Sequence, residues 1–230
     1  MSILITLLML SVIVIFHEAG HFITARTLNV NVTNFSIGFG PELFGFTYNG
    51  IRYKVCMIPL GGYVEMPDML EIPWYKSALI SLAGPLANFV LFYGVFLTIT
   101  YIVNFHTISF MEVFHFVNSG CVGILRDILN ISPKDVEFSG PIGMAAHVSA
   151  SHGWQDYYAQ FMSIDLSVGI LNLLPIPPLD GFRFLTSFLE PMIGKERTNT
   201  FTRYAVGVGT LALIVFMVYI TGKDIIHLFK

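Results

Sequence analysis

The sequence predicts an α-helical polytopic membrane protein with about four transmembrane helices and a small membrane-associated β-hairpin or sheet between the first and second. Its 230 residues are 54% hydrophobic and only 12% charged, whereas soluble domains are about 25% charged. The mean hydropathy is +0.70. A chain of this composition cannot cover its surface with polar groups, so it belongs in a membrane. The net charge of −3 argues against a nucleic-acid partner.

The transmembrane helices are predicted from apolar runs of about 20 residues, the length that crosses a hydrocarbon core. The expected spans are residues 2–24, 78–103, 158–179 and 205–222. The first is expected to be retained, because it lacks the basic start and the cleavage site of a signal peptide. The third contains Pro175, Pro177 and Pro178 near its end, and we expect it to become irregular inside the membrane.

The connection between the first two spans contains a predicted β-region, at about residues 32–66. Apolar, strand-like segments flank the dipeptide Asn49-Gly50, which favours a hairpin turn. Because the segments are apolar on both sides of the turn, we expect a sheet that dips into the bilayer interface. The second connection, residues 104–157, begins with an amphipathic stretch over 105–117 that is expected to lie on the outer membrane surface.

The basic residues predict the orientation, since Lys and Arg favour the cytoplasmic side. The connections over residues 25–77 and 180–204 hold four basic residues each, whereas the connection over 104–157 holds two. This bias places the first and third connections in the cytoplasm and both termini outside. We expect the chain, residues 1–230, to form a single domain.

The strongest chemical signal is the sequence His-Glu-Ala-Gly-His at residues 17–21. Residues four apart share one face of a helix, so His17 and His21 can reach the same metal ion. Glu18 has the place of the catalytic glutamate in the HExxH zinc-protease motif. A chance match would leave these side chains with packing roles. They follow an apolar run, however, and ionisable groups at membrane depth are costly and usually functional.

A catalytic zinc site normally has three protein ligands, so one more is needed. Asp165 lies early in the third span and is compatible with an interfacial residue. Asp180 follows the three prolines and precedes Gly181, where the chain can turn sharply. A carboxylate on irregular backbone at membrane depth suits a cavity, although a helix cap or an interfacial charge is an alternative. With two histidines already present, Asp180 is the better candidate.

Together these segments resemble the site-2 protease family of intramembrane metalloproteases. HEAGH ends the first predicted span, and NLLPIPPLDG covers residues 172–181. Residues 35–40, 58–64 and 83–88 match the bacterial branch that cleaves anti-sigma factors, and residues 140–143 resemble a further family element. Two features depart from the family pattern. Phe182 stands where a second glycine is frequent, and residues 104–157 are too few for the PDZ domains that those relatives carry.

The resemblance implies one Zn²⁺ per chain, bound by His17, His21 and Asp180, with Glu18 as general base and later proton donor. It also implies a group of substrate-binding residues: Asn172, Pro59, Leu60, Gly61, Gly62 and Tyr63. The implied reaction is hydrolysis of peptide bonds within or near transmembrane segments, in regulated intramembrane proteolysis or in clearance of remnant signal peptides. The expected partners are transmembrane protein or signal-peptide substrates and the lipid bilayer. The expected location is the bacterial inner membrane, with the active site towards the cytoplasm.

Three other functions use the same residues differently. A metal transporter or channel also needs intramembrane His and Asp, but it has no need for Glu18, and the sequence lacks the internal repeat of many transporters. A catalytically inactive binding protein would have less reason to keep all four expected site residues. A non-enzymatic assembly factor, which only captures membrane segments, predicts that Glu18→Gln has no phenotype.

Overall fold

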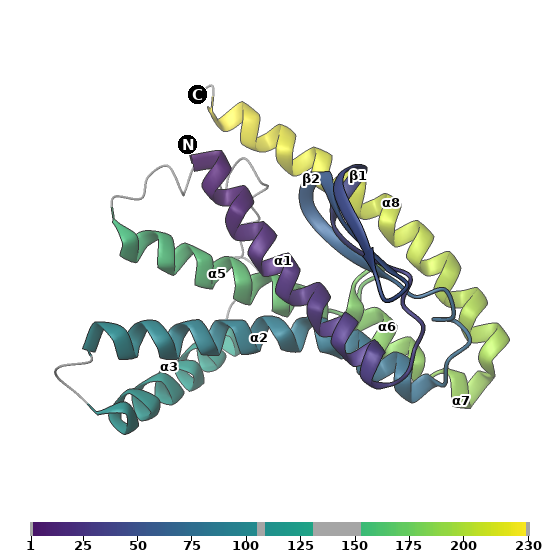
Figure 1. Cartoon of the computed structure of the whole chain (residues 1–230), viewed down its shortest axis with the longest axis horizontal. Helices are drawn as coiled ribbons and strands as arrows, with labels where there is room; N and C mark the ends of the chain where they lie inside the picture. The colour runs from purple at the N-terminus through teal and green to yellow at the C-terminus, as the bar shows by residue number, and fades with distance from the viewer. Residues whose placement is uncertain (1, 105–108, 131–152, 229–230) are drawn as a thin grey trace.

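The computed structural model describes residues 2–104, 109–130 and 153–228. The elements in chain order are α1 (Ser2–Thr27), β1 (Asn34–Tyr48), β2 (Ile51–Glu65), α2 (Trp74–Asn104), α3 (Phe110–Asn130), α5 (Trp154–Leu173), α6 (Asp180–Ser187), α7 (Glu190–Ile193) and α8 (Lys195–Leu228). In Figure 1, α1 crosses the middle of the molecule. Helix α3 and the later part of α2 lie on one side of it, together with the start of α5. The beginning of α2 lies beside α6 on the other side, where the two strands lie between α1 and α8.

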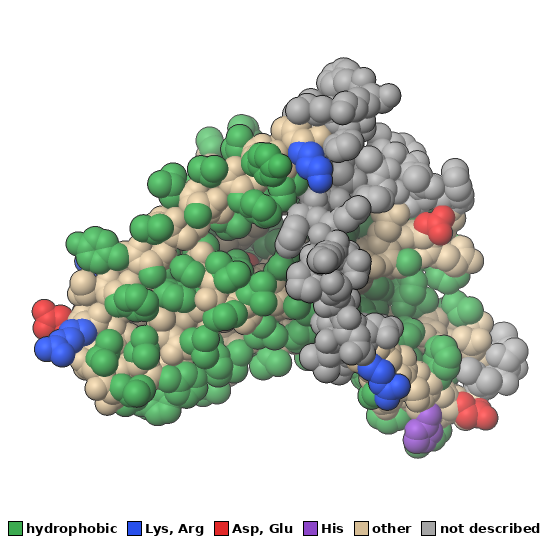
Figure 2. Space-filling model, turned by 180° about the vertical axis from the view of Figure 1, so that it is seen from behind, with side chains coloured by type: hydrophobic (Ala, Val, Ile, Leu, Met, Phe, Trp, Pro, Cys, Tyr) green, Lys and Arg blue, Asp and Glu red, His purple; other side chains and the backbone are tan. Residues whose placement is uncertain are grey.

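Three described helices are long and apolar enough to cross a membrane: Leu4–Thr27, Trp74–Asn104 and Lys195–Lys223. They correspond to three of the four expected spans. Helix α8 exposes apolar side chains along most of its length, as expected for a helix bordered by lipid. Figure 2, the view from behind, shows hydrophobic side chains spread over the described surface and few charged ones. A mostly helical membrane protein is therefore confirmed.

The fourth expected span, residues 158–179, is not among these helices. Helix α5 ends at Leu173, and the segment with the three prolines leads without helix to Asp180. A proline removes a backbone donor and clashes with the preceding turn, which explains why the helix stops there. The predicted irregular segment is confirmed, whereas the number of membrane-crossing helices is not.

The expected β-region is present as one two-stranded antiparallel sheet of β1 and β2. Asn49 and Gly50 both have positive φ, 48° and 78°, as a two-residue hairpin turn requires. The strands bend, so that Ile37 pairs with both Val55 and Gly62. The start of β1 therefore lies between the first and the last part of β2, and Gly62 in the last part lies against Val14 and Glu18 of α1.

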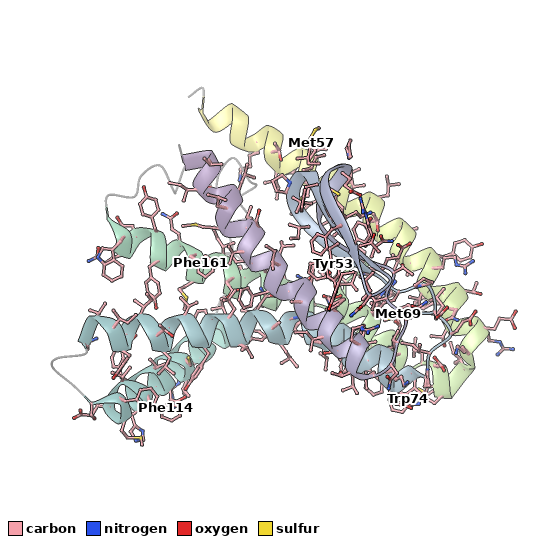
Figure 3. All side chains as sticks on the ribbon, in the orientation of Figure 1. Tyr53, Met57, Met69, Trp74, Phe114 and Phe161 are labelled. Atoms are coloured by element: carbon pink, nitrogen blue, oxygen red, sulfur yellow. The ribbon has the colours of Figure 1, made fainter. Side chains whose placement is uncertain are left out.

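Buried apolar residues join this sheet to the helices. The cluster consists of Ala25, Val30, Val32, Ile51 and Ile80, which come from the end of α1, the connection to β1, the start of β2 and α2. Figure 3 shows Tyr53 on the sheet beside α1, and Met69 and Trp74 where the chain passes from the sheet into α2. This packing sets the position of β2 relative to the HEAGH segment of α1.

The amphipathic stretch expected over residues 105–117 is helical where the structure describes it, in α3. Val113 and Val117 are completely buried, and Tyr93 on α2 donates a hydrogen bond to Asn118 at 3.1 Å. Helix α3 therefore packs on α2, and its predicted contact with the membrane surface stays a prediction. The family-like segment at residues 140–143 lies outside the described residues.

Candidate metal centre

His17 and His21 lie one helical turn apart on α1, and both are buried. Their Nε2 atoms are 3.2 Å apart. The outer nitrogen of each ring faces an oxygen that can only accept a hydrogen bond. His17 Nδ1 donates to Asn88 Oδ1, and His21 Nδ1 donates to the carbonyl oxygen of Ile80, both at 2.7 Å. Each ring therefore carries its hydrogen on Nδ1 and keeps the Nε2 lone pair for a metal ion.

Asp180 reaches the same point from a segment 163 residues away in sequence from His17. It is the first residue of α6, directly after the non-helical segment that follows α5. A Cβ atom at Gly181 would overlap the carbonyl oxygen of Leu173, so only glycine allows α6 to start so close to the end of α5. As a result, Asp180 Oδ2 lies 3.0 Å from His17 Nε2 and 3.2 Å from His21 Nε2.

The three ligand atoms fit a zinc ion. Two imidazole nitrogens and one carboxylate oxygen are an established donor set for catalytic zinc. Tetrahedral coordination with bonds of about 2.0–2.1 Å requires donor atoms roughly 3.3–3.5 Å apart. The observed separations are within a few tenths of an ångström of that requirement. Among the described residues, this is the one group of three or more His, Cys, Asp or Glu side chains with metal-binding geometry.

Glu18 borders a cavity of about 400 Å³ that also contains the three candidate ligands. One wall is formed by the last part of β2, and a Cβ atom at Gly62 would lie 2.9 Å from Glu18 Cγ. Arg183 lines the cavity one turn after Asp180. Burial lowers the pKa of its guanidinium, and the Asp180 carboxylate partly offsets this effect. The carboxylate of Glu18, the guanidinium of Arg183 and the last part of β2 therefore line the same cavity as the metal-binding cluster.

The structure brings only part of the predicted substrate-binding set to this cavity. Gly62, Tyr63 and Asn172 line it, and Asn172 donates through Nδ2 to the carbonyl oxygen of Val168 at 3.0 Å. Pro59 and Gly61 are not among the described lining residues, and Gly61 packs against the ring of Phe39 instead. The side chain of Leu60 lies outside the described residues.

The sequence also left parts of the centre unassigned. Asn88 was not assigned a role in the centre, yet it accepts a hydrogen bond from the candidate ligand His17. The expectation that Asp165 is interfacial is wrong, because Asp165 is completely buried and accepts a hydrogen bond from Asn88 Nδ2 at 2.7 Å. The available signal was the presence of two polar residues in apolar segments that are otherwise expected to face lipid or protein.

Gly84 on α2 lies directly against the two histidine rings. A Cβ atom there would be 2.7 Å from His17 Nε2 and closer still to His21 Nε2. We expect Gly84→Ala to displace the rings and to abolish zinc binding, measured as zinc per purified chain. Gly94→Ala on the same helix is the matched control, since a Cβ atom there meets nothing within 4 Å. Normal zinc content in Gly84→Ala would contradict this placement of the site.

Comparisons with known proteins identify the family. The model for peptidase family M50 matches residues 5–216. The chain belongs to this family of zinc metalloproteases, which is the site-2 protease family that the sequence resembles. Rhizobium meliloti and Rickettsia conorii each have a relative named as a zinc metalloprotease, 35% and 39% identical over 116 and 109 residues.

Those two alignments cover 39% and 40% of this chain but only 31% and 30% of the relatives. A Fusobacterium nucleatum protein, also named as a zinc metalloprotease, is 23% identical over the whole of both chains. Among solved structures, the site-2 protease of Methanocaldococcus jannaschii matches 95% of this chain and 68% of its own, with 20% identity and a TM-score of 0.45. The alignments to the Rhizobium meliloti and Rickettsia conorii relatives therefore span less than a third of those relatives' length.

Proposed function

We propose that this chain is a zinc-dependent endopeptidase that cleaves peptide bonds within or near the transmembrane segments of other proteins. One observation carries the proposal. The Nε2 atoms of His17 and His21 and the carboxylate of Asp180 converge beside Glu18, in a cavity that one strand of the sheet borders. The helix that supplies three of these residues is apolar enough to cross the membrane.

The residues of the cavity divide the chemistry between them. His17, His21 and Asp180 hold the metal, and a zinc ion in such a site supplies activation of water and polarisation of the scissile carbonyl group. Glu18 takes a proton from the attacking water and returns it to the leaving amine. The Nδ1 hydrogen bonds of the histidines keep both rings oriented towards the cavity.

The substrate must expose its backbone before it can be cut. A transmembrane helix hides its carbonyl groups in internal hydrogen bonds, so local unwinding has to come first. The strand over residues 62–64 lines the cavity next to Glu18. An unwound substrate segment that pairs with this strand would regain the hydrogen bonds it lost. Substrates are therefore transmembrane proteins or remnant signal peptides with helix-weakening residues near the cut.

The orientation of the protein in the membrane is inferred from the positions of its basic residues. The HEAGH segment lies in the last three turns of α1, and the connection that follows it is rich in basic residues, as is the segment over residues 180–204. This distribution favours an active site towards the cytoplasm. Water can then reach the cavity from the cytoplasmic side. The proposed location of the protein is the inner membrane of a bacterium.

The test is cleavage by the purified chain in liposomes. Two single-span substrates are compared, one with helix-weakening residues in the middle of its span and one with leucines at the same positions. We expect cleavage of the first inside the weakened segment, much slower cleavage of the second, and loss of activity on zinc chelation that added zinc restores. Equal cleavage of the two would contradict the unwinding step. Transport of zinc without any cleavage would favour the transporter alternative.

A further inference from the structure

A chain of two hydrogen bonds lies behind the metal-facing side of His17. Asn88 on α2 accepts the Nδ1 hydrogen of His17 through Oδ1, and its Nδ2 donates to Asp165 Oδ1 on α5, each at 2.7 Å. Asn88 and Asp165 are both completely buried. These two hydrogen bonds therefore connect α1, α2 and α5 in the protein interior, where no bulk water competes for them.

The chemistry of the carboxylate, the amide and the imidazole decides which group donates and which accepts in these two hydrogen bonds. A carboxylate only accepts hydrogen bonds, so Asp165 has to face the amide nitrogen of Asn88. The amide oxygen is then left for His17, and because this oxygen also only accepts, the ring hydrogen has to be on Nδ1. The residue at position 165 thus decides which nitrogen of His17 keeps a lone pair for the metal.

The second histidine shows why His17 needs this support. His21 Nδ1 bonds the backbone carbonyl of Ile80, and a backbone oxygen cannot exchange places with a donor. The side-chain amide of Asn88 can rotate by half a turn and would then offer its NH₂ group to His17. Such a rotation would favour the opposite tautomer, in which Nε2 carries the hydrogen and has no lone pair to bind the metal.

Packing alone does not account for a carboxylate at this place. A buried carboxylate at membrane depth is costly, and an apolar side chain of similar shape would fill the same space. Asp165 Oδ2 is buried without a hydrogen-bond partner in the described part of the chain. The one hydrogen bond described for the Asp165 carboxylate is the bond that Oδ1 accepts from Asn88.

We propose that Asp165 is a positioning residue of the metal centre. Acting through Asn88, it holds His17 in the orientation and tautomer in which Nε2 binds zinc. This inference rests on the proposed function, since it requires that His17, His21 and Asp180 bind zinc.

Two variants test the role of Asp165. Asp165→Leu removes the acceptor and keeps a similar shape. The double variant Asn88→Asp with Asp165→Asn exchanges the two groups, so that the carboxylate now accepts from both the His17 ring and the relocated amide. Zinc affinity is measured by competition with a chelator. The His17 tautomer is measured in the metal-free protein from ¹⁵N chemical shifts, assigned with His17→Gln.

We expect Asp165→Leu to weaken zinc binding roughly 10- to 100-fold, which is the usual effect of losing a residue that orients a metal ligand by hydrogen bonding. It should also give a mixture of His17 tautomers. The exchanged pair should regain nearly wild-type affinity and the single tautomer with hydrogen on Nδ1. Asp156→Asn, an exposed change on the same helix, should alter neither quantity.

Unchanged affinity and tautomer in Asp165→Leu would overturn the positioning role while leaving the proposed function intact. An exchanged pair as impaired as Asp165→Leu would also overturn it, because the effect would then not depend on the direction of the hydrogen bonds. A wild-type protein that takes up no zinc would overturn the proposed function and this inference together.

Discussion

Glu18→Gln is expected to stop peptide cleavage while zinc stays bound. Glu18 borders the cavity next to the three candidate ligands but is not one of them. Glutamine has nearly the same shape and cannot take up a proton. A positioned general acid–base group contributes roughly 10²–10⁴ to a rate, so we expect a loss of at least that size. The measurements are the cleavage rate in liposomes and the zinc content of the same preparation.

Glu196→Gln provides the control for this prediction. Glu196 is exposed in the first turn of α8, so its substitution makes the same chemical change away from the cavity and should preserve cleavage. Wild-type cleavage by Glu18→Gln would remove Glu18 from the mechanism. Loss of zinc together with activity would instead show that Glu18 holds the metal site together.

The local parts of this centre could be predicted because they depend on short-range geometry. Helical periodicity alone places His17 and His21 on one face. The Asn49-Gly50 turn follows from the backbone preferences of two residues. The end of α5 at Leu173 can be predicted from the three prolines that come shortly after it. For the same reason Asp180 was a candidate ligand, although its 3.0 Å approach to His17 Nε2 required the three-dimensional structure.

The remaining parts depend on how the helices pack, and a single sequence does not reveal that. The position of Asp165 early in the third predicted span was compatible with an interfacial residue, yet its burial and its contact with Asn88 place it in the protein interior. The two glycines of α2 show the same limit. Gly84 packs against the two histidine rings, whereas a Cβ atom at Gly94 meets nothing within 4 Å, and only the structure distinguishes them.

Asp180→Ala is expected to remove zinc from the purified protein and to abolish cleavage with it. Asp180 is the only carboxylate in the described three-residue cluster, and the other two donors are imidazole nitrogens. Removing it takes away a direct ligand and a negative charge, so the loss of zinc affinity should exceed the roughly 10- to 100-fold cost of losing an outer partner.

The fold should survive this substitution. Alanine favours helix. The N-cap of α6 is Leu179, which makes no side-chain capping hydrogen bond, and the carboxylate of Asp180 contacts His17 and His21 instead. Circular dichroism and elution in detergent check this expectation, and Asp68→Ala, at an exposed position before α2, is the matched control. A folded Asp180→Ala protein with full zinc content would mean that the metal does not need α6. Because α6 carries both Asp180 and Arg183 into the cavity, that result would separate the proline-rich turn from catalysis and leave the HEAGH helix as an incomplete site.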